Sequence, residues 1–466
     1  MNSVVLFENR NLSGGYNTDV NAYLNKSNES REALGCDFNE VGSIKRVSGY
    51  ETFGTGLPSY EVLGLYDFKT STGTTKFLSA TGGKIYSFES GTWTERYTSL
   101  NTSRPMTFAT HLDRVIATNG DDSPIFSADG ETWETLSGSP PKGNYVLTFN
   151  NSVYMLNLQG ATSRIQWSDD GTISTWNSDN TLDVITNVGL GDQITGGAVN
   201  NNNLIIFKNY STWKWDTVSL VTLNTNAGCT SPRSIATIDN WTFWLSHKGI
   251  MATSGGKPER ISNAVSDFIE GITDLRSCVG WAENNFYRLY IGTSNGVSNC
   301  VLIYDFDNNV WSYESLQDPV KASAILTDTN GAQGFTDRSA YFGDDSGQIY
   351  KYGTGNNNNG APIPFKWVSR LETAQYPYRE KEFEYLYVFT DKEAKPGVDV
   401  YISIDYKDFQ FIGNANKSTS LLRIPSGSHG HHIRISFQTN NTGEQQTIYG
   451  YMGVGKVLPW RLTDVG

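Results

Sequence analysis

The sequence is poor in cysteine, in charge and in long apolar runs, and each shortage excludes a class of protein. The cysteines are scattered without a Cys-x-x-Cys pair, at Cys36, Cys229, Cys278 and Cys300. This spacing indicates neither a zinc knuckle nor a disulfide framework, and we expect free, buried thiols. No stretch approaches the ~18 apolar residues of a membrane helix, and the opening residues lack the basic start of a secretory signal. We therefore expect a chain made in the cytosol that does not insert into a membrane.

Clustered positive charge is also missing. The 36 Lys plus Arg residues are outnumbered by 48 Asp plus Glu, the formal net charge is −12, and we find no cationic run beyond Lys45-Arg46. A protein that clamps nucleic acid through its phosphates needs clustered cations. The acidic balance instead suits a surface past which double-stranded DNA moves without sticking and without sequence-specific contact.

What the chain does contain is one short design repeated seven times: an aliphatic or aromatic strand, a Gly/Asp/Asn turn and a second strand, often followed by Gly-x-x-Trp. The repeats centre on Ile85, Ile125, Ile165, Trp213, Ile250, Ile303 and Ile349. The first two steps are both 40 residues, and the later ones are 48, 37, 53 and 46. A period of this length made of short strands is typical of a β-propeller. We expect seven blades, with six or eight possible because the 53-residue step could contain an irregular blade.

Composition and length agree with an all-β chain of more than one part. Hydrophobic residues make up only 38%, aromatics reach 13% and glycines number 46, which suits many short strands and tight turns. We predict an N-terminal extension over residues 1–59, in which the strand from Ser43 to Phe53 closes the ring, and the propeller over 60–355. The polar segment from Asn356 to Gly360 is predicted as a linker. Alternating strands over 361–466 then indicate a C-terminal β-sandwich.

Catalytic motifs are absent from the sequence: it has no Gly-x-Ser-x-Gly elbow, no HExxH and no phosphate loop. Two segments, Ser127–Trp133 and Ser168–Trp176, are close to the Asp-box turn of sialidases, and we interpret both as structural turns whose Trp packs between blades. Tyr and Arg residues are present but dispersed, so their convergence cannot be read from one sequence. We predict that the protein is not an enzyme and assign no catalytic, cofactor-binding or metal-binding residue.

Three short segments could suggest a metal, and we interpret each as a loop or turn. His429-Gly-His-His432 holds three of the five histidines but has no carboxylate or Cys partner nearby in the sequence. Asp305–Asn309 and Asp344–Gly347 resemble calcium loops without the Gly and terminal Glu of a complete one. Hairpin turns explain them better, and no cofactor is expected.

Several segments resemble virion proteins of tailed bacteriophages. They are Asn11-Leu-Ser-Gly-Gly-Tyr-Asn-Thr18, Asn28-Glu-Ser30, the run from Phe38 to Tyr50, Leu245-Ser-His-Lys-Gly-Ile-Met251 and Lys257-Pro-Glu-Arg-Ile-Ser262. They are similar to the nozzle proteins of short-tailed phages, also described as head-completion or packaged-DNA-stabilisation proteins. Where that family usually has Arg-Pro-Gly before the first blade, this chain has Arg46-Val-Ser-Gly49.

The resemblance implies a structural role in the virion. Six copies would form a ring in the phage neck, below the portal and adaptor, that extends and closes the DNA channel, helps retain packaged DNA and contacts tail fibre or tail needle proteins. One alternative is a carbohydrate-binding or sialidase-like propeller of a tail fibre, which convergent Arg, Tyr and Glu residues in one propeller mouth would favour. A second alternative is a cellular propeller scaffold.

Overall fold

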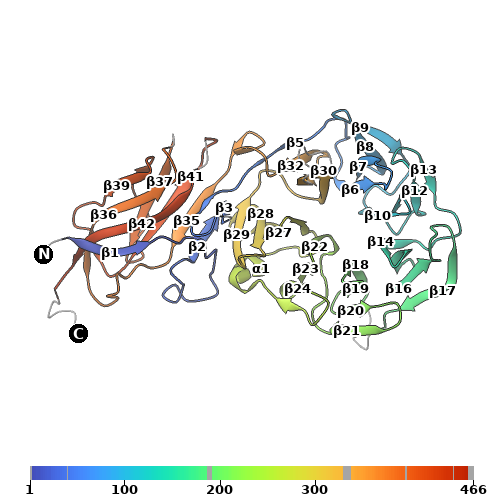
Figure 1. Cartoon of the computed structure of the whole chain (residues 1–466), viewed down its shortest axis with the longest axis horizontal. Helices are drawn as coiled ribbons and strands as arrows, with labels where there is room; N and C mark the ends of the chain where they lie inside the picture. The colour runs from blue at the N-terminus through green and yellow to red at the C-terminus, as the bar shows by residue number, and fades with distance from the viewer. Residues whose placement is uncertain are drawn as a thin grey trace.

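The chain forms a β-propeller joined to a β-sandwich (Figure 1). A computed structural model describes residues 3–38, 40–185, 192–328, 337–393, 396–443 and 446–459. Within them, no helix is long and apolar enough to cross a lipid bilayer. The prediction of an all-β fold with a propeller and a C-terminal sandwich-like domain is confirmed.

Five four-stranded antiparallel sheets make up most of the propeller. The first contains β6 (Val62–Lys69), β7 (Thr75–Thr81), β8 (Lys84–Glu89) and β9 (Thr92–Tyr97). The second contains β10 (Thr107–His111), β11 (Arg114–Thr118), β12 (Ile125–Ser127) and β13 (Trp133–Thr135). The third contains β14 (Gly143–Phe149), β15 (Ser152–Leu158), β16 (Ala161–Ser168) and β17 (Trp176–Asp183). The fourth contains β18 (Ile194–Asn200), β19 (Asn203–Lys208), β20 (Thr212–Trp215) and β21 (Leu220–Asn224). The fifth contains β22 (Ala236–Ile238), β23 (Trp241–Ser246), β24 (Gly249–Thr253) and β25 (Glu259–Arg260).

The last two blades belong to larger sheets. The sixth blade contains β26 (Val279–Glu283), β27 (Phe286–Ser294), β28 (Val297–Asp305) and β29 (Val310–Ser315). The seventh contains β30 (Ala322–Asp328), β31 (Asp337–Gly343), β32 (Ile349–Tyr352) and β5 (Tyr50–Thr52). The seven repeats seen in the sequence therefore correspond to the third strands of the seven blades, β8, β12, β16, β20, β24, β28 and β32.

The ring closes through the first strand of each blade and through a strand from the N-terminal segment. The inner strands β6, β10, β14, β18, β22, β26 and β30 each contact the next, and β30 contacts β6. β5 pairs antiparallel with β32, with Tyr50 opposite Tyr352 and Thr52 opposite Tyr350. The long step between the fifth and sixth repeats holds no extra blade. It holds the 3-10 turn η2 (Asn263–Val265) and helix α1 (Ser266–Glu270). A second 3-10 turn, η1 (Pro232–Ser234), precedes β22.

The predicted linker is instead folded. β33 (Asn357–Asn358) pairs with β34 (Ala361–Pro362) and, in parallel, with β5, so the segment extends the seventh blade. Asn358 is only 3% exposed. Gly49 packs against the same segment, since a Cβ there would lie 1.8 Å from the carbonyl oxygen of Asn357. The prediction failed because a polar, glycine-flanked run can be a hairpin as readily as a linker.

Two sheets make up the sandwich, and both take strands from the N-terminal segment. One has the order β1 (Val4–Asn9), β42 (Ile448–Val457), β36 (Lys381–Thr390) and β39 (Thr419–Arg423), with β40 (His429–Gly430) also on β36. The other has the order β2 (Ser30–Leu34), β35 (Phe365–Ser369), β41 (Ile433–Thr439), β37 (Val398–Ile404) and β38 (Gln410–Ala415). β2 also bridges to β29 of the sixth blade, and the hairpin β3 (Cys36–Asp37) and β4 (Lys45–Arg46) follows it.

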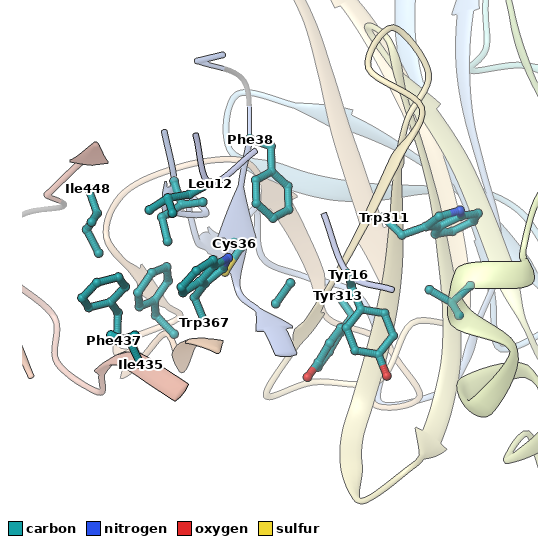
Figure 2. Close-up of a cluster of buried hydrophobic side chains, with 14 of the residues drawn as sticks. Leu12, Tyr16, Cys36, Phe38, Trp311, Tyr313, Trp367, Ile435, Phe437 and Ile448 are labelled. Carbon is teal, nitrogen blue, oxygen red and sulfur yellow. The ribbon is translucent and has the colours of Figure 1, made fainter. Parts of the chain in front are cut away.

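A single apolar core runs through the junction between propeller and sandwich (Figure 2). Trp367 of β35 is fully buried and lies 5.7 Å, ring to ring, from Phe437 of β41. On the propeller side, Tyr16 of the N-terminal segment packs edge-on against Tyr313 of β29 at 5.2 Å. Because the same core takes side chains from the N-terminal segment, the fifth and sixth blades and the sandwich, these parts form one continuous packed unit.

Candidate functional site at the mouth of the propeller

One end of the propeller axis opens into a cavity of about 530 Å³, which we call the mouth. All seven blades contribute to its lining, from the beginnings of the inner strands or the residues just before them: residues 63–65, Met106 and Thr107, Asn144 and Tyr145, Thr195, Ile235, Val279 and Gly280, and Ala322 and Ser323. Residues far apart in the sequence meet here because every inner strand begins at this end of the axis. The volume lies within the range of small-molecule sites.

β-Bulges set three of the lining residues out of register with their neighbours. The pairing of β6 with β7 skips Leu63, that of β18 with β19 skips Thr195, and that of β15 with β16 skips Asn157. Asn157 has a φ of +55°, a left-handed conformation that Asn tolerates better than most residues. Bulges re-aim side chains, and all three of these residues line the mouth.

The lining is cationic although the whole chain is acidic. Of the described residues that line the mouth, Arg104, Arg233 and Arg276 are positively charged, and none is negatively charged. Arg104 is held at the rim, where its Nε lies 3.0 Å from Oδ2 of Asp121. The Arg276 side chain is exposed, and no described residue accepts a hydrogen bond from its guanidinium.

Arg233 is the most enclosed of the three cations. Its Nη1 donates to the carbonyl oxygen of Lys321 at 2.6 Å and lies 3.8 Å from Oε1 of Glu61. Burial lowers the pKa of the Arg233 guanidinium, but an arginine stays charged at neutral pH. Tyr145 is close enough to interact electrostatically with it, and burial raises the pKa of the Tyr145 phenol. Arginine and tyrosine therefore converge at the mouth, whereas Glu61 lies beside Arg233 without lining the cavity.

Two polar atoms of the lining lack a partner. Oδ1 of Asn157 and Oγ1 of Thr195 are buried without a hydrogen bond to any residue that the structure describes. The side chains of these residues are enclosed, because Asn157 is 4% and Thr195 5% exposed. Nδ2 of Asn157 does donate, to the carbonyl of Ile194 at 2.5 Å. Because both atoms have almost no accessible surface, a group held in the mouth does not reach them in this conformation, and we interpret them as part of the packing between blades.

The described lining of the mouth is rich in groups suited to binding a polar ligand. Its described lining contains no His, Cys, Asp or Glu, the side chains that most often act as general acids and bases. It offers guanidinium groups, side-chain amides and hydroxyls, which together can hold an anionic group and hydrogen-bond a polar skeleton. The sequence could not reveal this site, because its residues are spread from Leu63 to Ser323 in pairs that look like ordinary strand ends.

A second set of ionisable residues is buried between the sixth and seventh blades. Nη1 of Arg288 lies 3.2 Å from Oε2 of Glu283, and the hydroxyl of Tyr352 donates to Oε1 of Glu314 at 2.6 Å. Burial raises the pKa of the Glu314 carboxyl to about 7, against the lowering effect of the Tyr352 hydrogen bond and the Arg288 charge. Glu314 is 2% exposed and its carboxyl is already hydrogen-bonded, so we interpret this set as structural.

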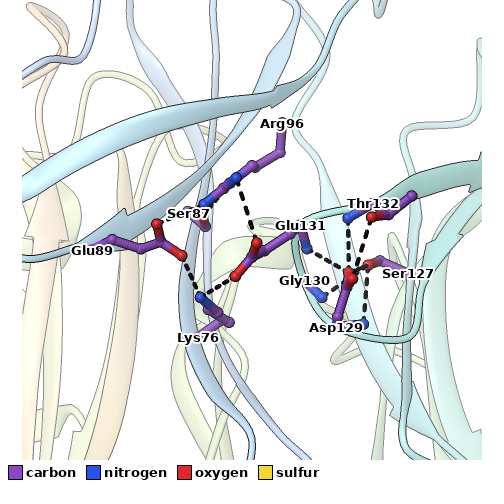
Figure 3. A network of polar contacts seen from close by, with 9 residues as sticks. All are labelled: Lys76, Ser87, Glu89, Arg96, Ser127, Asp129, Gly130, Glu131 and Thr132. Carbon is purple, nitrogen blue, oxygen red and sulfur yellow. Dashed lines mark hydrogen bonds and ion pairs between the residues drawn. The ribbon is translucent and has the colours of Figure 1, made fainter.

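The first Asp-box is a structural turn, as the sequence predicted (Figure 3). Oδ1 of Asp129 accepts hydrogen bonds from the backbone amides of Glu131 and Thr132, at 2.8 and 2.7 Å, and from Oγ of Ser127 at 3.0 Å. Burial raises the pKa of the Asp129 carboxyl, but these hydrogen bonds outweigh that effect and the pKa is lowered. Trp133 is 8% exposed and packs in one cluster with residues of the first two blades.

The same turn connects to the first blade through charges (Figure 3). Glu131 pairs with Lys76, which also pairs with Glu89. Arg96 lies 2.7 Å from Glu89 and 3.6 Å from Glu131.

In the second Asp-box segment, Ser168–Trp176, the hydroxyl of Ser168 donates from Oγ to the carbonyl oxygen of Thr172 at 2.8 Å.

The other segments singled out in the sequence stay apart from the mouth. His431 and His432 lie 3.6 and 3.3 Å from Asp405 in the sandwich, and the described residues contain no group of three or more His, Cys, Asp or Glu side chains placed to hold a metal ion. Asp305 and Asp344 cap turns, accepting hydrogen bonds from the amides of Asn308 and Ser346 at 3.0 and 2.9 Å. All four cysteines are free and buried, which confirms that prediction.

Comparison with known proteins identifies no family for this chain. No protein-family model and no curated protein matches it. Among solved structures, YCF48 bound to D1 peptide is 10% identical with a TM-score of 0.42, and covers 66% of this chain and 97% of its own. YCF48 from Cyanidioschyzon merolae is 12% identical with a TM-score of 0.44, and the match covers 66% of this chain and 98% of that chain. BamB from Moraxella catarrhalis is 14% identical with a TM-score of 0.39, and the match covers 76% of this chain and 98% of that chain. These distant likenesses say nothing of function. The fold assignment rests on the seven blades themselves, and the chain is similar to these solved proteins in architecture alone.

Proposed function

We propose that this protein is a structural subunit of a tailed-phage virion. In this proposal six copies form a ring in the phage neck, below the portal and adaptor, that extends and closes the DNA channel and helps to retain packaged DNA. Tail fibre or tail needle proteins would contact the same ring. The sequence segments that resemble phage nozzle proteins motivate the proposal, and one structural observation supports it: the propeller and the sandwich are continuous with each other.

That continuity suits a part under mechanical load. The N-terminal segment contributes β1 to one sandwich sheet, β2 to the other and β5 to the seventh blade. Arg46, between these strands, is 4% exposed and donates from Nη1 to the carbonyl of Asn441 at 2.5 Å and from Nη2 to that of Gly443 at 2.7 Å. A ring that restrains packaged DNA must transmit force between its parts, and a shared core with crossing strands resists bending at the junction.

Charge and chemistry are consistent with the same role. The net charge of −12 disfavours tight binding to phosphates, so DNA could pass the ring without being held. We propose that the protein is not an enzyme, in keeping with the lack of His, Cys, Asp, Glu and Lys among the described residues that line the mouth.

The ring is tested on purified virions. We expect the protein in the particles, in isolated portal and tail complexes, and at about six copies per particle, because a heterologous contact that closes gives a cyclic ring on a cyclic template. Quantitative mass spectrometry gives the copy number, and an electron-microscopy reconstruction gives the location. Absence from virions, or presence only at the distal tips of fibres, would refute the ring.

A second candidate function, ligand binding by a tail-fibre propeller, is favoured by the convergence of Arg104, Arg233 and Tyr145 with Glu61 beside them. The two candidates differ in where the protein sits: a fibre propeller must reach the host surface. The same reconstruction distinguishes them.

A further inference from the structure

We propose that the mouth of the propeller binds an acidic sugar, whose carboxylate pairs with arginines of the lining and whose hydroxyls meet its accessible polar side chains. This inference concerns the mouth of the propeller in a single protomer. It rests on the ligand-binding candidate and is independent of the ring.

The first step is the charge of the ligand. Asp121 lies beside Arg104, Glu61 lies beside Arg233, and the charge of Asp274 also acts on Arg233. Asp121 makes a close pair with its arginine, whereas Glu61 stays 3.8 Å from Nη1 of Arg233 and no described residue pairs with Arg276. Positive charge therefore remains uncompensated in a chain of net charge −12, which favours an anionic ligand.

The second step is the shape of the anionic group. A guanidinium binds planar carboxylates with two parallel hydrogen bonds. Nη1 of Arg233 is fixed by the carbonyl of Lys321, while Nη2 donates to no described residue. Arg233 is therefore held in place with donors left for a ligand, and Arg276 can approach from the exposed side.

The third step is the remainder of the ligand. The polar lining includes the hydroxyl of Thr230 and the side-chain amides of Asn144 and Gln193, each of which can donate and accept hydrogen bonds. The amide of Asn119 is already used, since it accepts from the backbone amides of Asp121 and Asp122 and donates to the Asp122 carboxylate. A skeleton of neighbouring hydroxyls next to one carboxylate matches this set.

The fourth step is size. The cavity of about 530 Å³ lies on the propeller axis and is enclosed by all seven inner strands, so it forms a pit and not a groove. A pit of this volume takes a terminal unit of a chain. We therefore assign the end of an acidic glycan, rather than an extended peptide, as the ligand.

The experiment measures binding of N-acetylneuraminic acid and glucuronic acid to the purified full-length protein by saturation-transfer NMR and calorimetry. The methyl ester of N-acetylneuraminic acid and glucose are the matched neutral probes. We expect saturable binding of at least one acidic sugar, and binding of its neutral counterpart weaker by about tenfold or more, because a charge-assisted pair is lost.

Variants place the ligand in the mouth. Arg276→Gln removes an exposed cation without disturbing the fold, and we expect about tenfold weaker binding of the acidic sugar. Arg164→Gln is the control, because Arg164 is also exposed but pairs with Asp183 in the third blade. It should bind like the unaltered protein, and melting temperatures check that both variants fold.

Three outcomes would overturn the assignment: no saturable binding of either acid, equal binding of acid and neutral sugars, or equal loss in both variants. Tighter binding of a short acetylated glutamate peptide than of the sugars would show a peptide site instead. None of these results affects the ring, which is judged from virions.

Discussion

The outer edge of the contact between the first two blades is stabilised by polar interactions, whereas the junction between propeller and sandwich is stabilised by apolar packing. At the outer edge of the blade contact, a turn capped by Asp129 and a set of ion pairs around Lys76 and Glu131 lie close to solvent. At the junction, aromatic and aliphatic side chains around Trp367 are excluded from water. The difference indicates that blade contacts can be adjusted locally, whereas the junction is part of the core of the whole chain.

Among single substitutions, the largest loss of folding stability is expected at the junction between propeller and sandwich. Trp367→Ala should lower the free energy of unfolding by about 3–5 kcal/mol, because a fully buried indole leaves a cavity. Chemical denaturation followed by tryptophan fluorescence and by far-UV circular dichroism measures the loss.

Trp133→Ala, at the blade contact, is the matched comparison. Its cost should be about 3 kcal/mol, the lower end of the same range, because that indole is 8% exposed. Tyr378→Ala, at a residue that is 81% exposed, should change little and serves as the control. If Trp133→Ala proved the more damaging change, the contrast between the two regions would be wrong.

A smaller effect is expected from the Asp-box. Asp129→Ala should cost about 1–2 kcal/mol at pH 7, since two backbone amides and two hydroxyls lose a charged acceptor. Asp129→Asn keeps an acceptor and removes only the charge, so it should cost less.

The effect of Asp129 should also depend on pH. Because its pKa is lowered in the folded protein, its stabilisation is present above the pKa of the unfolded chain and is lost as the pH falls through the folded value. The difference between the unaltered protein and Asp129→Ala should therefore shrink between pH 5 and pH 2. Urea titrations across that range measure it, and a constant difference would mean that the charge has no part in the turn.

The smallest effect is expected from the ion pairs. Glu131→Gln should cost up to about 1 kcal/mol at low salt and almost nothing in 1 M NaCl, because its partners are partly exposed and screened. Glu95→Gln removes a pair with Lys84 inside the first blade and should cost less, since it joins no second blade. A salt-independent loss in Glu131→Gln would point to packing rather than charge.

The sequence predicted features whose residues are close together in the chain, and it did not reveal features that depend on residues far apart in the chain. The seven repeats were recognisable because each third strand and its turn lie within a few residues. The run from Ser43 to Phe53 likewise alternates as a strand, and Tyr50–Thr52 does pair with the seventh blade. Nothing in Val4–Asn9 or Ser30–Leu34 indicates that these strands enter the sandwich, because their partners lie hundreds of residues away.

Two smaller misses have the same origin. Ser262 stands directly before Asn263–Val265, where a serine often caps a helix, but its Oγ instead accepts a hydrogen bond from the amide of Ile250 in the fifth blade. The mouth remained hidden because single arginines, amides and hydroxyls at strand ends carry no signal until the ring brings them together. Convergence is a property of the closed ring and not of any one segment.

The N-terminal strands β1, β2 and β5, which pair with distant partners, also affect the order in which the chain can fold during synthesis. β5 leaves the ribosome early, but its partner β32 follows about 300 residues later, which at the usual pace of translation is a delay of about 15 to 60 s. β1 waits longer still, for β42 near the end of the described chain. Until then the first fifty residues have exposed strand edges and apolar side chains without partners. The nascent chain is therefore most vulnerable to aggregation and proteolysis until β42 has been made and has paired with β1.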